Sequence, residues 1–155
     1  MTSVQPLLVL LGQSEIERDA AQADLQRLLA AHQAAVTQAE QLLTYRRDYE
    51  QRWGAQFQNS GAMELVHCYR GFMDRLTQAV EQQQRVARHA EAQVDTARAA
   101  LLATELRVAT VRKLIERRGL DERIANNRQE QKISDEFASR SAWNRAGGGN
   151  LSPTA

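Results

Sequence analysis

The sequence has few residues that break helices or build a compact core. Its only two prolines are Pro6 and Pro153, near the two ends, and aromatic residues are 5% of the chain. Alanine, glutamine, arginine, leucine and glutamate, most of which favour helices, dominate the remainder. This composition predicts long helices or a coiled coil rather than an ordinary globular core.

Cysteine is almost absent too. Because Cys68 is the only one, no disulfide can form within the chain, and this usage fits a reducing cytosol. The apolar stretch PLLVLLG at residues 6–12 is too short to span a bilayer, and no basic segment of a secretory signal precedes it. We therefore expect a cytoplasmic protein.

No single sign of charge prevails. Twenty lysine and arginine residues are interspersed with nineteen aspartate and glutamate residues, for a formal net charge of +1. This balance does not point to a nucleic acid or an anionic membrane as partner. The basic cluster RKLIERR at residues 112–118 is diluted by Glu116 and contains no aromatic residue. It fits a solvated helix face; the alternative is a docking surface for an acidic protein partner.

Sequence patterns of catalysis and metal binding are also missing. His32, His67, His89 and Cys68 do not have the spacing of a zinc site. The sequence contains no phosphate-binding loop, no dinucleotide fingerprint and no nucleophile elbow. We expect no enzymatic activity, no metal and no cofactor. His32 is better explained as a polar interruption that fixes the register of a coiled coil.

What the sequence does contain is a heptad pattern. From Val66 to Ile115, apolar residues recur at alternating intervals of three and four, and thirteen of fifteen such positions are apolar. The composition alone would give about six or seven. A weaker series, ten of fourteen, runs from Leu7 to Trp53. Ser14 and Glu17 fit a capping box, so a helix start at Ser14 is an alternative to one near Pro6.

A cluster of turn residues, GAQFQNSGA at residues 54–62, separates the two series. We expect Ser60 or Asn59 to cap the second helix and Gly61 to relax the backbone near its start. Short connections favour antiparallel neighbours, which makes a helical hairpin the expected arrangement.

Antiparallel packing requires the numbers of facing residues to sum to a constant. Trp53 with Tyr69 and Leu7 with Ile115 both give 122, so the second seam stops where its partner stops. The predicted fold class is therefore all-α: a long antiparallel two-helix coiled-coil hairpin with a C-terminal helical overhang. The expected bounds are residues 1–145 for the single hairpin, about 7–56 and 62–141 for its helices, about 57–61 for the turn, and 146–155 for a flexible tail.

At about 1.5 Å per residue, the first helix would be about 70 Å long and the second about 110–120 Å. Residues 117–140 would then project without a partner helix. Isolated helices of that length are marginal in water, so we expect another molecule to stabilise this arm.

A second stripe of residues is expected beside the seam near the turn, with paired numbers that sum to 121. Its members are Gln38, Leu42, Tyr45 and Tyr49 on the first helix, and Phe72, Leu76, Ala79 and Gln83 on the second. Tyr45 and Phe72 fall where a solvated coiled coil normally carries charge. The stripe fits either a protein-binding patch or a core that widens near the turn, and both interpretations stay open.

Three stretches carry a resemblance to a known family: LLTYRRDYEQR at residues 42–52, YRGFMDRLTQAVEQQ at 69–83 and IERRGLDERIANNRQEQKISDEFASR at 115–140, within which EQKISDEFA at 130–138 is the most specific. In these stretches the chain resembles the FliJ family of the bacterial flagellar export apparatus. The resemblance covers roughly residues 5–140. It implies a cytoplasmic helical hairpin, similar to the central stalk of rotary ATPases, whose end with both termini enters the hexameric flagellar export ATPase.

The resemblance also implies two further partners, the cytoplasmic linker of the export gate and, for some members, export chaperones. The family's gate-binding surface matches the stripe defined above, except that Gln83 replaces an expected histidine. The candidate ATPase contacts are Arg112, Lys113, Arg117, Arg118, Arg123 and Phe137. The implied function is a non-enzymatic coupling stalk, held at the cytoplasmic face of the inner membrane through the export apparatus.

Two other interpretations stay open. The homologous stalk of a virulence injectisome would share the architecture and differ in its ATPase. A structural coiled coil that self-associates would form a concentration-dependent dimer, whereas a closed hairpin predicts a monomer.

Overall fold

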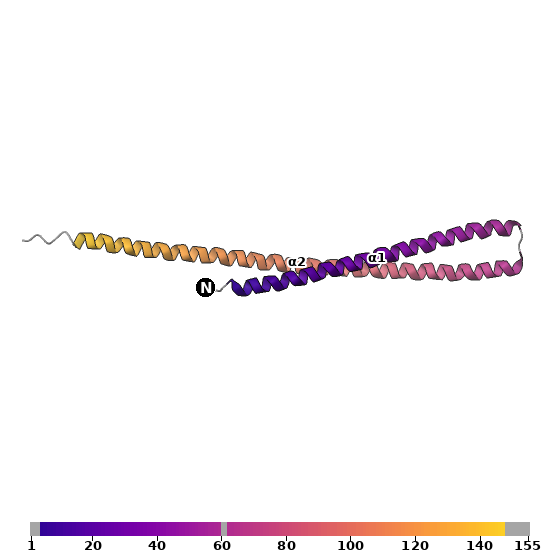
Figure 1. Ribbon diagram of the computed structural model, residues 1–155, viewed down its shortest axis with the longest axis horizontal. Helices are drawn as coiled ribbons and strands as arrows, with labels where there is room; N and C mark the ends of the chain where they lie inside the picture. The colour runs from indigo at the N-terminus through magenta and orange to yellow at the C-terminus, as the bar shows by residue number, and fades with distance from the viewer. Residues whose placement is uncertain (1–3, 60–61, 148–155) are drawn as a thin grey trace, which may run out of the picture. The chain divides into compact units, whose positions relative to one another are not determined.

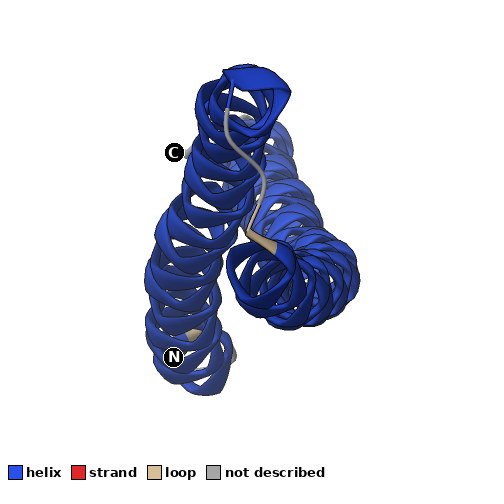
Figure 2. Ribbon diagram, turned by 90° about the vertical axis from the view of Figure 1, so that its right-hand side faces the viewer, coloured by secondary structure: helices blue, strands red, loops and turns tan. Residues whose placement is uncertain are grey.

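The structure is a computed structural model that describes residues 4–59 and 62–147. It contains two helices, α1 (Gln5–Asn59) and α2 (Met63–Gly147), of 55 and 85 residues (Figure 1). Their lengths are about 82 Å and about 127 Å at 1.5 Å per residue. The described residues form no strand, and helix dominates the view in Figure 2. The predicted all-α fold, with two long helices packed as a hairpin, is confirmed.

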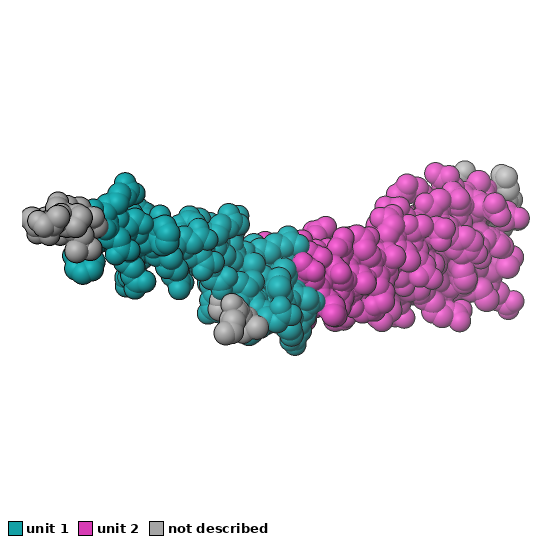
Figure 3. All heavy atoms as spheres, turned by 60° about the vertical axis from the view of Figure 1, so that its left-hand side comes forward, with its two compact units in different colours: residues 1–13, 108–155 teal, residues 14–107 magenta. Residues whose placement is uncertain are grey.

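The chain divides into two compact units (Figure 3). One comprises residues 14–107 and holds the parts of α1 and α2 nearest the turn. The other comprises residues 1–13 and 108–155. Both helices continue in sequence from one unit to the other. Within residues 14–107, the two helices run antiparallel and side by side.

The core follows the predicted heptad pattern. All eleven buried hydrophobic side chains of the described residues occupy positions of the two seams: Leu25, Ala35, Ala39, Met73, Leu76, Val80, Ala90, Val94, Ala97, Val108 and Val111. In residues 14–107, Leu25 packs with Val94 and Ala97 in one cluster. Several core positions are alanines, whose small side chains let the helix backbones approach closely. Burial of this apolar surface is the main stabilising contribution to the packing of the two helices.

Polar side chains also join the two helices in residues 14–107. The Gln83 amide donates to the backbone oxygen of Ala35 at 3.4 Å and to the side-chain oxygen of Gln38 at 3.3 Å. Nearer the far end of this unit, Arg107 donates to Glu17 at 2.6 Å. Each of these polar side chains bonds one particular residue on the opposite helix, so the contacts favour this register over registers shifted along the helix axis.

Three polar residues of α1 interrupt the seam at regular intervals. Arg18, His32 and Arg46 are fourteen residues apart, which is two heptads, and all three are half-buried. The Nε atom of Arg46 is buried and has no hydrogen-bond partner among the described residues. A donor left in this state costs about 1–3 kcal/mol. Arg46 therefore opposes the stability that the surrounding apolar residues supply.

α1 extends about three residues beyond its expected end at about residue 56. α1 continues through Gly54 to Asn59, because aromatic packing compensates for the weak helix propensity of glycine. The Phe57 ring lies 5.7 Å from Trp53, one turn earlier, and 5.2 Å from Tyr69 on α2. A Cβ atom at Gly54 would meet no other atom within 4 Å, so the packing there does not require glycine.

The predicted helix caps were also partly wrong. The backbone oxygen of Ala62 accepts hydrogen bonds from the amides of Leu65 and Val66, at 3.1 and 3.2 Å, so Ala62 precedes α2 directly. Asn59 is the last residue of α1 and does not occupy the position that precedes α2. The other two residues expected at this cap, Ser60 and Gly61, lie outside the described residues.

At the other end of α1, the helix begins at Gln5 rather than at Ser14. Pro6 suits the first turn of a helix, since its missing N–H would have no partner there. The amide of Leu8 donates to the backbone oxygen of Val4 at 3.0 Å. Ser14 is therefore not a cap but an interior residue, with only 2% of its surface exposed.

The C-terminal part of α2 forms the predicted helical arm. Every residue from 117 to 140 is exposed except Gly119 and Glu122, which are half-buried. Ala146 and Gly147, expected in the tail, still belong to α2, and residues 148–155 lie outside the described part. No helical stretch of the described residues has the length and hydropathy needed to cross a membrane.

Candidate partner-binding surfaces

The eight stripe residues all belong to residues 14–107, and the structure brings both halves of the stripe together. Gln83 donates to Gln38 at 3.3 Å, and the rings of Tyr49 and Phe72 lie 4.6 Å apart with their planes tilted by 45°. Both contacts join residues whose numbers sum to 121, as the antiparallel pairing predicts.

Exposure divides the stripe into two parts. Leu76 is buried and belongs to the core, whereas Leu42, Tyr49, Phe72 and Gln83 are half-buried. The remaining members are exposed, and Tyr45 has 51% of its surface in contact with solvent. The two interpretations of the stripe thus apply to different residues: it widens the core at its centre and presents side chains at its margin.

Six of the eight aromatic residues form one cluster near the turn. They are Tyr45, Tyr49, Trp53 and Phe57 on α1, and Tyr69 and Phe72 on α2. The Tyr49 ring is central, with neighbouring ring centroids at 4.6–6.0 Å. Sequence analysis did not extend the stripe to Trp53 and Phe57, although the spacing of four residues from Tyr45 onward indicated one helix face.

A small hollow opens beside this cluster. It has a volume of about 240 Å³ and is lined by Tyr49, Trp53, Leu65, Cys68, Tyr69 and Phe72. Burial is the main cause that raises the pKa of Tyr69 above its ordinary value of 10.0; Glu50 and Tyr49 add to it, and Arg46 opposes it. The Tyr69 phenol therefore keeps its proton at neutral pH.

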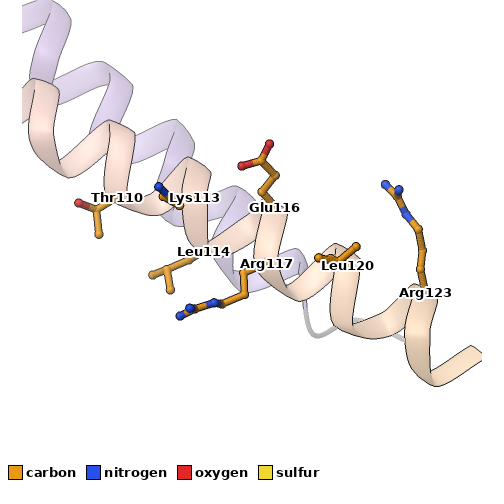
Figure 4. Close-up of a pocket in the computed structure, with 7 residues that line it drawn as sticks. All are labelled: Thr110, Lys113, Leu114, Glu116, Arg117, Leu120 and Arg123. Carbon is orange, nitrogen blue, oxygen red and sulfur yellow. The ribbon is translucent and has the colours of Figure 1, made fainter.

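The candidate ATPase contacts are all exposed on α2, but the structure brings only three of them together. Lys113, Arg117 and Arg123 line a shallow groove with Thr110, Leu114, Glu116 and Leu120 (Figure 4). Arg112 and Arg118 do not line it. Phe137, 73% exposed, is fourteen residues beyond Arg123, about 21 Å further along the helix axis.

Sequence analysis did not single out the two leucines of this groove. Leu114 and Leu120 are 42% and 55% exposed, although leucine is usually buried. The available signal was that both fall outside the heptad seam, among charged residues. Among the described residues, no three histidine, cysteine, aspartate or glutamate side chains could hold a metal ion together.

Comparison with known proteins gives one match. The family model described as "Flagellar FliJ protein" matches residues 3–147 of the 155-residue chain. No curated protein and no solved structure matches it. Since the family match spans nearly the whole chain, the protein belongs to the FliJ family of non-enzymatic coiled-coil components of flagellar export.

Proposed function

We propose that this protein is the coupling stalk of the flagellar type III export apparatus. One end binds the ring of the export ATPase, and the other binds the cytoplasmic linker of the export gate. The observation that carries this proposal is that the two helices present two chemically different exposed surfaces. One is the margin of the stripe on α1 near the turn, where Tyr45 is exposed. The other is the arm of α2 from Arg112 to Phe137, which carries seven basic and six acidic residues beside exposed apolar ones.

The ATPase end is supported by an excess of exposed apolar side chains. Residues 4–13 and 108–147 are 50 of the 142 described residues, yet they carry nine of the sixteen exposed large hydrophobic side chains. These nine are Leu8, Val9, Leu10, Leu114, Leu120, Ile124, Ile133, Phe137 and Trp143. Leu8, Val9 and Leu10 are consecutive, so they point to different sides of α1. Apolar side chains on several sides of a helix fit a partner that surrounds it, such as a ring.

The gate end is supported by the exposed part of the stripe. Tyr45 is half-exposed beside the Tyr49 ring, at a centroid distance of 6.0 Å, and Gln38 and Ala79 are exposed along the same face. Tyrosine contributes a large contact area with little loss of conformational entropy, which is why it is enriched in interfaces. Export chaperones are proposed as further partners, and the protein would reside at the cytoplasmic face of the inner membrane through the apparatus.

The test of the ATPase end is the steady-state ATP hydrolysis rate of the cognate export ATPase. The full-length chain is expected to raise this rate and promote ring assembly, whereas a version that ends at Arg118 is not. If neither version changes the rate, the stalk proposal fails and a self-associating coiled coil is the better explanation. Sedimentation of the chain alone over a range of concentrations would then show a dimer.

The test of the gate end uses a single exposed residue and a matched control. Tyr45→Ala is expected to weaken binding of the gate linker, measured by titration calorimetry, and to leave helicity unchanged. Ile16→Ala removes an exposed apolar side chain of α1 outside the stripe and is expected to bind the linker like the unmodified chain. Equal loss in both variants would contradict a specific role for the stripe. Because the matching family is the flagellar one, an injectisome role is not proposed.

A further inference from the structure

The shallow groove of α2 has a composition that differs from an ordinary solvated helix face. Three cations, Lys113, Arg117 and Arg123, line the groove together with the exposed leucines Leu114 and Leu120. Figure 4 shows Leu114 and Arg117 projecting from the same side of the helix. Glu116 is the only acidic residue among the seven that line the groove.

The cations of the groove have no anionic partner among the residues that the structure describes. Lys113, Arg117 and Arg123 form no ion pair within the described part of the chain, whereas Arg107, about two to four turns earlier on α2, pairs with Glu17. Lys113 and Arg117 are also four residues apart on one helix face, where like charges destabilise the helix by about 0.2–0.5 kcal/mol. A negatively charged partner would remove this repulsion.

The leucines indicate what else the partner must offer. The two exposed leucines are six residues apart, which places them about 9 Å apart along the axis and about 120° apart around it, on the part of α2 that is not buried. Apolar side chains framed by charges of one sign suit an amphipathic helix with charges of the other sign. Nucleic acid fits less well, since no aromatic side chain lines the groove and Glu116 would repel phosphates.

A second groove on the same helix shows which features matter. It is lined by Arg128, Gln131, Lys132, Asp135, Glu136, Ser139 and Arg140, and its volume of about 590 Å³ is close to the 680 Å³ of the first. It has the same number of cations. However, it contains two carboxylates and no apolar residue, so it offers neither a net charge of similar size nor an apolar contact.

We propose that the groove at residues 110–123 binds an acidic amphipathic helix of another protein. Apolar side chains of that helix pack on Leu114 and Leu120, and its carboxylates pair with Lys113, Arg117 and Arg123. The eleven residues from Lys113 to Arg123 span about 15 Å, so the bound segment has at least about ten helical residues. The inference rests on the proposed function, because the three cations belong to the surface proposed to meet the export ATPase.

The experiment measures the binding of a defined peptide to the full-length chain by fluorescence anisotropy. The probe is a fluorescein-labelled helical peptide of about 18 residues with leucine on one face and glutamate on both flanks. A second peptide with lysine in place of each glutamate is the charge control. The acidic peptide is expected to bind saturably at 150 mM salt, where charges separated by more than about 8 Å are screened, and the basic peptide is not.

Three variants of the chain test the groove itself. Combined Lys113→Glu, Arg117→Glu and Arg123→Glu is expected to raise the Kd of the acidic peptide by about 100-fold or more. Combined Leu114→Ala and Leu120→Ala, both at exposed sites, is expected to raise it about tenfold. The matched control, Arg128→Glu with Lys132→Glu and Arg140→Glu, changes the net charge equally and is expected to alter the Kd less than about threefold.

Several outcomes would overturn the proposal. These are absence of saturable binding, an equal loss in the control variant, or leucine variants that bind like the unmodified chain, since the last two indicate unspecific attraction. Tighter binding of a single-stranded DNA of about 20 nucleotides, with displacement of the peptide, would assign the groove to nucleic acid instead. If the peptide fails to bind while the chain still stimulates the ATPase, only this inference falls. If it binds while stimulation is absent, the proposed function falls.

Discussion

The aromatic cluster allows stability and partner binding to be separated by two alanine substitutions. Replacing a fully buried aromatic residue by alanine costs about 3–5 kcal/mol. Tyr49 is half-buried, which roughly halves this cost, and its ring lies 4.6 Å from Phe72 and 6.0 Å from Tyr69 across the hairpin. Such ring pairs add about 0.5–1.5 kcal/mol. We expect Tyr49→Ala to lower the free energy of unfolding by about 2–3 kcal/mol.

The neighbouring tyrosine should behave differently. Tyr45 is 51% exposed and has a single ring neighbour, Tyr49, at 6.0 Å. We expect Tyr45→Ala to cost about 0.5 kcal/mol, because surface substitutions usually remain near that value. Tyr49→Phe, which keeps the ring and removes only the hydroxyl, is the control and should stay close to the unmodified chain.

The assay is urea denaturation followed by circular dichroism, with a thermal scan beside it. For a chain of this size, about 1 kcal/mol shifts the Tm by about 2–4 °C, so Tyr49→Ala should lower the Tm by about 5–10 °C. A cost below about 1 kcal/mol for Tyr49→Ala, or an equal cost for Tyr45→Ala, would refute the assignment of Tyr49 to the core. With the predicted result, loss of gate binding in Tyr45→Ala can be attributed to the interface.

Three other substitutions test separate features of residues 14–107. Arg46→Met removes the buried Nε donor that has no partner among the described residues, and should raise the free energy of unfolding in urea by about 1 kcal/mol. Arg107→Ala breaks the exposed ion pair with Glu17 and should cost about 0.2–1 kcal/mol; a loss that persists in 1 M salt would contradict a screened surface pair. Burial, and secondarily Glu50, raises the pKa of Tyr69. The protonated Tyr69 phenol therefore contributes stability that is fully present below pH 10.0 and is lost as the pH rises through the folded-state pKa. Tyr69→Phe should therefore lose less stability in alkaline urea titrations than the unmodified chain, and an unchanged alkaline profile would count against this pKa shift.

The heptad seam could be predicted from the sequence because it depends on local spacing. Intervals of three and four residues place side chains on one face of a helix, and this follows from the helical period alone, without knowledge of tertiary contacts. The antiparallel pairing followed from one additional constraint, the short connection, and it correctly brought Tyr49 to Phe72 and Gln38 to Gln83. The stripe and the core were thus accessible without a structure.

The end of α1 was not predictable in the same way. The turn residues from Gly54 onward placed the expected end of the helix near residue 56, and the contact that favours a longer helix joins Phe57 to Tyr69 across the turn. That contact exists only after both helices have formed and packed. The groove of α2 was missed for another reason: the spacing of Leu114 and Leu120 does not continue the seam, and their exposure is visible only once the buried face is known.

The fourteen-residue interval of Arg18, His32 and Arg46 also makes axial slip between the helices costly. A slip of one heptad would move Arg46 from Leu76 to Gln83 and would part Gln83 from Gln38, its present hydrogen-bond partner. A slip of two heptads would place each of these polar residues where another of them now lies. The three residues between α1 and α2 are too few to allow such a slip. Within residues 14–107 the two helices are therefore held in one axial register.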